Sequence, residues 1–217
     1  FKYLLKMDVV DDDITIKIIA PKSSKKLPVF FTPKELNLLL GLMKENLNSF
    51  SSYRDYLLIN MLYSTGIRQN ELINLKDSDV ANNYIKVLGK RNKERIVPIT
   101  KELSNLIDVY KEYKLKLTST EENLLLTNKG KKMYPKFVFR TVNKYIGYVS
   151  TEKKRSAHTL RHSFATNTLN NGAKLHTIKE VLGHASLTAT QVYTQNSIER
   201  LKDAYKQFHP KENNKLK

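Results

Sequence analysis

The strongest constraint on the fold is a series of signals that begin and end helices. Thr32, Pro33 and Glu35 predict a helix start, because a threonine cap, a proline at the first helical position and a glutamate three residues after the cap form a capping box. Three later helical segments are each expected to end at a glycine: Gly66, Gly172 and Gly183. Most of the chain is therefore expected to be helical.

Apolar residues recur at helical spacing, so each helix is expected to bury one face. In the segment 159–171 the inward residues are expected to include Leu160 and Leu169. The next segment is defined by the spacing of Leu175, Ile178, Val181 and Leu182. The expected helices are one from Thr32 through Met43, Ser52–Ser64, a short one with Arg68 and Glu71, Leu103–Leu117, Tyr134–Ile146, Thr159–Asn171, Leu175–Leu182, a short one from Thr188 to Tyr193, and Ile198–Phe208.

One stretch departs from the helical pattern. Tyr84–Leu88 and Arg95–Ile99 are rich in residues that favour strands, and they flank Gly89–Glu94, so they predict a β-hairpin. Pro98 has no N–H to donate, which places the second strand at a sheet edge. The expected fold class is therefore mainly α with a small antiparallel β-sheet (α+β).

The N-terminal residues 1–27 differ from the rest of the chain. They contain Asp11–Asp13 and the polar run Pro21–Lys26, and are expected to form a tail and linker. A length of 217 residues allows one large core, so residues 28–217 are expected to form a single domain.

Charge indicates the partner. There are 38 Lys and Arg against 21 Asp and Glu, a net charge of +17, which favours binding to a polyanion such as nucleic acid. A lysine-rich solvated surface is the alternative. The chain has 0 Cys, which excludes disulfides and thiolate metal sites. No apolar run is long enough to cross a membrane.

Several residues of complementary chemistry are spread along the chain. Together they suit a tyrosine that attacks a phosphodiester while cations hold the phosphate. No acidic cluster accompanies the histidines, so a metal-dependent nuclease is disfavoured and no metal is expected. The candidate catalytic residues are Arg68, Lys90, His158, Arg161, His184 and Tyr193.

Two arginines are candidates for gripping the phosphate. His158 and Arg161 are spaced i and i+3, so they share a helical face where the arginine fork and the histidine can both bind phosphate oxygens. Arg68 follows a helix end, and Glu71 one turn later is expected to orient it. The alternatives are ordinary surface residues and surface ion pairs.

Lys90 lies in the predicted hairpin, from which a flexible ammonium could protonate a leaving 5′ oxygen. A solvated turn lysine is the alternative, and Lys93 is the nearest rival for the general acid. Arg91, Lys93 and Arg95 are candidate DNA contacts.

His184 and Tyr193 complete the candidate set. His184 follows a glycine that ends a helix, and its ring could bind the phosphate and accept the tyrosine proton. Tyr193 is one of 12 tyrosines, and neighbouring cations would lower its high phenol pKa. Packing or capping is the alternative for each of them.

In this order the motifs resemble those of the tyrosine recombinase (phage integrase) family, especially its bacterial Xer-like branch. The resemblance covers about Pro28 to Pro210. Its motifs are Thr65–Leu72, Gly89–Lys90 with Asn92–Arg95 and Val97–Pro98, His158–Thr166 with His162 as a supporting residue, Leu182–His184 and Val192–Thr194.

The resemblance implies a catalytic domain that acts on double-stranded DNA in the cytoplasm without a cofactor. It also implies a tetramer on two duplexes, in which the C-terminal helix Ile198–Phe208 docks on a neighbouring protomer, with folding back onto its own chain as the alternative. Family members usually carry an N-terminal DNA-clamping domain, of which residues 1–27 would be the last stub. Arg91 stands where a glycine is common, which changes the turn that presents Lys90 or adds a phosphate contact.

Two other functions stay open. A type IB topoisomerase uses the same tyrosine chemistry to relax supercoiled DNA. A DNA-binding regulator is suggested by the stretch from Leu160 through Gly172 to Leu182, which could form a helix-turn-helix. The regulator does not account for Arg68 or Tyr193.

Overall fold

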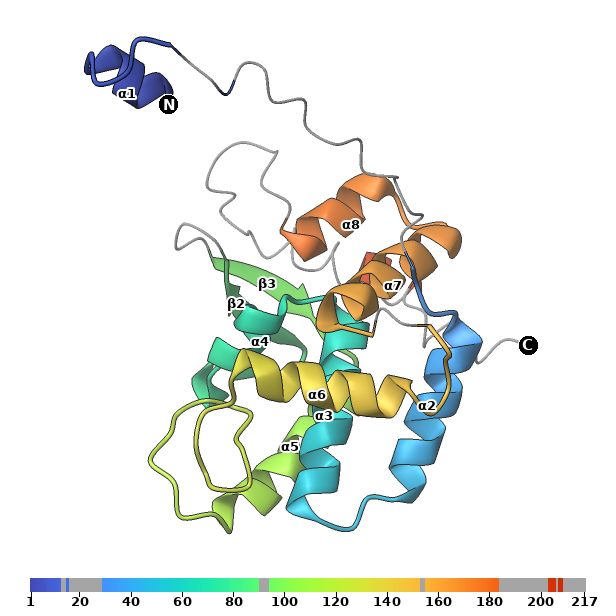
Figure 1. Cartoon of the computed structure of the whole chain (residues 1–217). Coiled ribbons are helices and arrows are strands. Elements are labelled where there is room, and N and C mark those ends of the chain that lie inside the picture. The colour runs from blue at the N-terminus through green and yellow to red at the C-terminus, as the bar shows by residue number, and fades with distance from the viewer. Residues whose placement is uncertain are drawn as a thin grey trace.

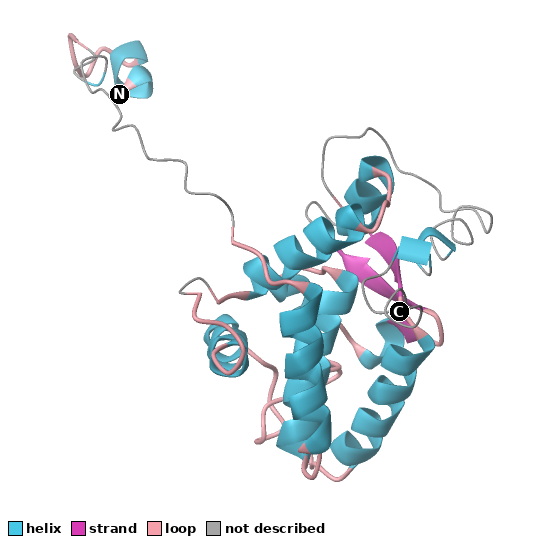
Figure 2. Cartoon of the chain, turned by 90° about the vertical axis from the view of Figure 1, so that its right-hand side faces the viewer, coloured by secondary structure: helices cyan, strands magenta, loops and turns pink. Residues whose placement is uncertain are grey.

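A computed structural model describes residues 1–12, 15, 29–89, 94–152, 155–183, 203–205 and 207–208. The predicted class, mainly α with one small antiparallel sheet, is confirmed (Figure 1, Figure 2). The described elements are α1 (Lys2–Lys6), α2 (Pro33–Glu45), α3 (Phe50–Thr65), α4 (Gln69–Asn74), a 3-10 turn (Asp77–Asp79), β1 (Val80–Ala81), β2 (Tyr84–Leu88), β3 (Glu94–Pro98), α5 (Lys101–Leu115), α6 (Pro135–Ile146), α7 (Ala157–Asn170) and α8 (Leu175–Leu182).

Helix α3 forms the centre of the core, with α2, α5 and α7 packed against it (Figure 1). It begins after Ser49, whose hydroxyl accepts a hydrogen bond from the Ser52 N–H, and ends at Gly66 in the left-handed conformation. The predicted end at Gly66 is confirmed, as is the capping box of Thr32 and Glu35 at the start of α2. The fully buried residues of α3 include Leu57, Leu58, Ile59, Met61 and Leu62.

The sheet has three antiparallel strands in the order β1-β2-β3. β2 and β3 form the predicted hairpin, in which Val97 lies opposite Ile85 and Pro98 opposite Tyr84. β3 pairs only with β2 in this order, so the prediction that Pro98 lies in an edge strand is confirmed. β1 was not predicted, because two residues are too few to show a strand pattern.

One predicted core residue lies on the surface. Leu169 is 45% exposed, so the prediction that it points inward is wrong. Leu169 is nine residues after Leu160, which at about 100° per residue puts it on the opposite side of α7. The buried face carries polar residues beside Leu160 and Phe164. Ser163 accepts from the Phe31 N–H at 2.8 Å, and the Asn167 amide donates to the Phe31 carbonyl at 3.1 Å.

The C-terminal helix predicted at Ile198–Phe208 is described only at residues 203–205 and 207–208, and residues 203–205 are helical. Tyr205 is buried, and its hydroxyl donates to the Ser64 carbonyl at 2.8 Å. The Asn171 amide donates to the Phe208 carbonyl at 3.3 Å. The described part therefore folds back onto its own chain. The predicted helix from Thr188 to Tyr193 lies outside the described residues.

We expect Gly66→Ala to lower the free energy of unfolding by about 3 kcal/mol, since it combines left-handed backbone strain with overpacking. Gly66 has φ 61°, and a Cβ there would lie 2.5 Å from Phe164 Cδ1 and 2.8 Å from Leu182 Cδ2. Urea denaturation measures the change. Gly41→Ala is the matched control: no atom lies within 4 Å of its added Cβ, and it should stabilise α2 by about 1 kcal/mol. Equal effects of the two substitutions would contradict this account.

Candidate active site

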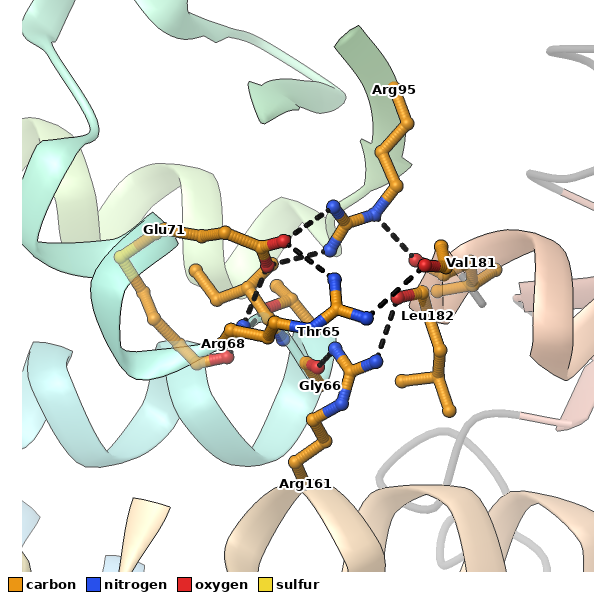
Figure 3. Close-up of polar contacts among 11 residues, drawn as sticks. Thr65, Gly66, Arg68, Glu71, Arg95, Arg161, Val181 and Leu182 are labelled. Carbon is orange, nitrogen blue, oxygen red and sulfur yellow. Dashed lines mark hydrogen bonds and ion pairs between the residues drawn. The ribbon is translucent and has the colours of Figure 1, made fainter. Parts of the chain in front are cut away.

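Three consecutive backbone carbonyls at the end of α8 each accept a hydrogen bond from a different arginine. Carbonyls in the last turn of a helix lack partners within the helix, and the helix dipole favours cations there. The end of α8 therefore gathers arginines from β3, from α7 and from the residue before α4 (Figure 3). The pairs are Arg95 Nε with Val181 O at 3.0 Å, Arg161 Nη2 with Leu182 O at 2.7 Å, and Arg68 Nη2 with Gly183 O at 3.1 Å.

Arg68 is the arginine of this cluster that reaches solvent, with 35% of its side chain exposed. It is the cap residue directly before α4 rather than part of the helix. Its Nη1 donates to Glu71 Oε1 at 2.9 Å, and its backbone N–H donates to Oε2 at 2.7 Å. The expected contact with Glu71 is therefore present, and it holds Arg68 at both its backbone and its side chain.

Glu71 is buried and stays ionised. Burial raises the pKa of its carboxyl, but hydrogen bonds and charge from Arg95, with hydrogen bonds from Arg68, outweigh burial and lower the pKa to about 2. Both carboxylate oxygens accept from Arg95, at 2.8 and 2.7 Å. Glu71 is thus the anion that holds two arginines together (Figure 3).

Arg95 was predicted to contact DNA, and the structure places it elsewhere. It is 6% exposed, and all three nitrogens of its guanidinium donate to Glu71 or to the Val181 carbonyl, so its side chain is engaged inside the protein. The sequence contains a signal that was missed. In β3, Arg95 is two residues from Val97 and shares its buried face, because side chains alternate along a strand. Arg95 accordingly lies opposite the buried Val87.

Arg161 is a buried cation on α7. Its Nη1 donates to the Gly66 carbonyl at 2.6 Å, which ties α7 to the end of α3. Burial, and then the positive charges of Arg68 and Arg95, lower the pKa of Arg161 to about 10. The cluster holds three guanidinium groups and one carboxylate, which pairs with Arg68 and Arg95, so it has an excess of positive charge that a bound anion would neutralise.

The other candidate residues are placed as follows. His158 is exposed in the first turn of α7, one turn before Arg161. His162 is half-buried, and its ring meets that of Phe30 edge-on at 6.4 Å. The remaining candidates lie outside the described residues: Lys90, Arg91, Lys93, His184 and Tyr193.

Gly183 is the last described residue before His184, and its carbonyl already bonds Arg68. The arginine cluster therefore lies next to the point where the segment carrying His184 and Tyr193 begins. Within the described ranges, no three His, Cys, Asp or Glu side chains form a group that could hold a metal ion. None of the described helices is long and apolar enough to cross a bilayer.

We expect Glu71→Gln to remove an acid-sensitive part of the stability. The folded pKa of Glu71 lies below its usual 4.5, so the carboxylate stabilises the fold above pH 4.5 and loses this effect as pH falls toward 2. The shift corresponds to about 3 kcal/mol at neutral pH, of which about 2 kcal/mol disappears between pH 6 and pH 3. Urea denaturation across this range should show a smaller pH dependence in Glu71→Gln than in the unmodified protein.

Glu122→Gln provides the control for that experiment. Glu122 forms an exposed ion pair with Lys76 at 2.7 Å, and exposed pairs contribute little. The pH dependence of the free energy of unfolding should be the same in Glu122→Gln as in the unmodified protein. If it is also the same in Glu71→Gln, the stabilising role of Glu71 is contradicted.

Comparison with known proteins identifies the family of this chain. The model of the phage integrase family matches residues 29–200. Tyrosine recombinase XerC of Chlorobaculum parvum is 32% identical over 97% of this chain and 69% of its own length. Tyrosine recombinase XerD of Halalkalibacterium halodurans is 34% identical over 97% of this chain and 71% of its own length.

Solved structures show the same fold. The XerH site-specific recombinase bound to palindromic difH substrate, in a post-cleavage complex, has a TM-score of 0.70 and 28% identity over 89% of this chain. The XerA recombinase has a TM-score of 0.67 and 27% identity over 83% of this chain. The chain spans 58% of the XerH chain and 66% of the XerA chain. The match over residues 29–200 and the Xer relatives above 30% identity show that this chain belongs to the phage integrase family of tyrosine recombinases.

Proposed function

We propose that residues 28–217 are the catalytic domain of a site-specific DNA recombinase that cuts and rejoins strands through a 3′-phosphotyrosine intermediate. Tyr193 is the nucleophile, and Lys90 is the general acid. The phosphate is bound by Arg68, Arg161, His158 and His184. Glu71 supports Arg68, His162 is a second supporting residue, and Arg91 and Lys93 contact DNA outside the scissile phosphate.

The excess positive charge at the end of α8 is the observation that carries this proposal. Arg68 and Arg161 come from distant parts of the chain and bond adjacent carbonyls, Gly183 and Leu182. Each guanidinium has five N–H donors, more than these protein contacts use, so both can also donate to phosphate oxygens. A pair of fixed cations suits a phosphodiester whose negative charge grows in the transition state.

The reaction exchanges one phosphate ester for another. The Tyr193 oxygen bonds to phosphorus as the bond from phosphorus to the 5′ oxygen breaks. Lys90 gives a proton to the leaving 5′ oxygen, and His184 accepts the phenol proton. Attack on the phosphotyrosine by the 5′ hydroxyl of another strand reverses the step and joins the strands, so no ATP is consumed.

The proposed partner is double-stranded DNA. The XerH relative was solved with its difH substrate, and the net charge of +17 on this chain suits the same class of ligand. We further propose a tetramer on two DNA sites, joined through the C-terminal helix. In this assembly the contact of Tyr205 with its own chain would be exchanged for one with a neighbour.

Covalent trapping tests the function. A DNA site is first recovered by selecting bound molecules from a random-sequence library, and it is then rebuilt with a nick beside the expected cleavage position. Loss of the short fragment after cleavage prevents rejoining, so protein joined to a labelled 3′ end should accumulate on a denaturing gel. Tight binding without any covalent product would favour the regulator. Relaxation of supercoiled plasmids without site preference would favour the topoisomerase.

A further inference from the structure

Arg95 takes no part in the proposed chemistry, yet it contacts two groups that build the site. Its two terminal nitrogens bond both oxygens of Glu71, the carboxylate that holds Arg68. Its Nε bonds the Val181 carbonyl at the end of α8. One side chain from β3 therefore joins α4 to α8 (Figure 3).

The stem of Arg95 also touches the backbone just before His184. Gly183 has φ 64°, and a Cβ on it would lie 3.0 Å from Arg95 Cδ and 3.1 Å from its Nε. The turn that ends α8 thus rests directly on the Arg95 side chain. A shift of Arg95 would move both the carboxylate behind Arg68 and the Gly183 backbone at the end of α8.

We propose that Arg95 is a positioning residue of the recombinase site, which holds Glu71 and the end of α8 so that Arg68 and Arg161 converge on one phosphate. This inference rests on the proposed function. Arginine is suited to the role because its planar fork binds both oxygens of a carboxylate while Nε remains free for a carbonyl. Lysine has one nitrogen at the end of a flexible stem, so it cannot hold both partners in the same geometry.

Arg95→Lys is the first test, and Arg54→Lys is its matched control. Arg54 is also a buried arginine, 5% exposed, and its 2.7 Å ion pair with Asp55 has the same length as that of Arg95 with Glu71. Its other contacts are with Asn128 and the rings of Phe50 and Phe137. Both substitutions should therefore lower the unfolding temperature, but only Arg95→Lys should disturb the site.

The decisive measurement is the single-turnover rate of covalent attachment to the nicked duplex, compared with affinity for the intact duplex. Arg95→Lys should slow attachment by about 100-fold, as expected when catalytic groups are misplaced by about 1 Å. Its affinity for the duplex should stay within about threefold, because most phosphate contacts are unchanged. Arg54→Lys should attach at the unmodified rate while folded.

Further arms keep the test informative if Arg95→Lys does not fold. Gly183→Ala pushes against Arg95 from the other side and should slow attachment at least about 10-fold. Combining Arg95→Lys with Arg68→Lys should slow attachment by less than the product of the two single effects, since Arg95 acts in part through Arg68. Inorganic phosphate, titrated by calorimetry at constant ionic strength, should bind more weakly to Arg95→Lys than to Arg54→Lys.

The outcomes separate this inference from the proposed function. Unmodified protein that never attaches to DNA contradicts both. If the unmodified protein attaches to DNA, and folded Arg95→Lys or Gly183→Ala attaches at the same rate, only the role of Arg95 is overturned. Fully additive effects of Arg95→Lys and Arg68→Lys also overturn it, since two independent sites would then be acting. If Arg54→Lys slows attachment as much as Arg95→Lys does, Arg95 contributes to stability and does not position the site.

Discussion

Replacing Tyr193 by phenylalanine is expected to abolish covalent attachment of the protein to DNA. The substitution removes one oxygen, the atom that would bond to phosphorus, and leaves the aromatic ring in place. No other step can form the product without that oxygen, so a labelled nicked duplex should give no covalent band on a denaturing gel. Affinity for the intact duplex should change little, because the cations that bind phosphate remain.

Tyr148→Phe is the control for the nucleophile. Tyr148 is 65% exposed just after α6, so loss of its hydroxyl should leave attachment unchanged. Mass spectrometry of the trapped wild-type adduct should find the nucleotide on the peptide that contains Tyr193. Attachment that persists in Tyr193→Phe would show that another of the 12 tyrosines is the nucleophile.

Arg161→Lys is expected to slow covalent attachment by about 1,000-fold, the upper range for loss of one transition-state donor. Arg161 bonds the Gly66 and Leu182 carbonyls with two separate nitrogens, at 2.6 and 2.7 Å. A lysine nitrogen that reaches one of these carbonyls cannot also hold the other and grip a phosphate. Arg161→Lys should therefore lower mainly the attachment rate and reduce the affinity for DNA less.

The pH dependence of Arg161→Lys gives a second readout. Burial and the charges of Arg68 and Arg95 lower the pKa of the native arginine to about 10, and the same surroundings would lower the pKa of a lysine. Lysine loses its proton more easily than arginine. The residual attachment rate of Arg161→Lys should therefore fall as pH rises through the alkaline range, while the unmodified protein keeps its cation. Arg54→Lys again serves as the control, and an attachment rate for Arg161→Lys equal to that of Arg54→Lys would remove Arg161 from the site.

Much of the fold could be predicted because its signals are local. The capping box at Thr32, the helix end at Gly66 and the edge position of Pro98 each depend on a few neighbouring residues. The burial of single residues was predicted wrongly where a small error in helical spacing adds up along a helix. Leu169 lies on the outer side of α7, and polar Asn167 is buried because it bonds the Phe31 backbone.

The candidate site was predictable in its residue types but not in its construction. Arg68 and Arg161 stood out because their chemistry suits phosphate. The groups that position them are largely backbone carbonyls, of Gly66, Leu182 and Gly183. Every residue has a carbonyl, so no pattern of side chains marks which ones will accept these hydrogen bonds.

The sequence alone determined the helical character, the hairpin, the positive charge and the set of candidate phosphate-binding side chains, since each follows from residue type and local spacing. Strand alternation places Arg95 on the buried face, but only the tertiary structure decided that it bonds Glu71 while Arg68 reaches solvent. Both are arginines, and their different exposure arises from contacts with residues far along the chain, Gly183 for Arg68 and Glu71 and Val181 for Arg95. The end of α8 brings them together because its last carbonyls need donors that the helix itself cannot supply.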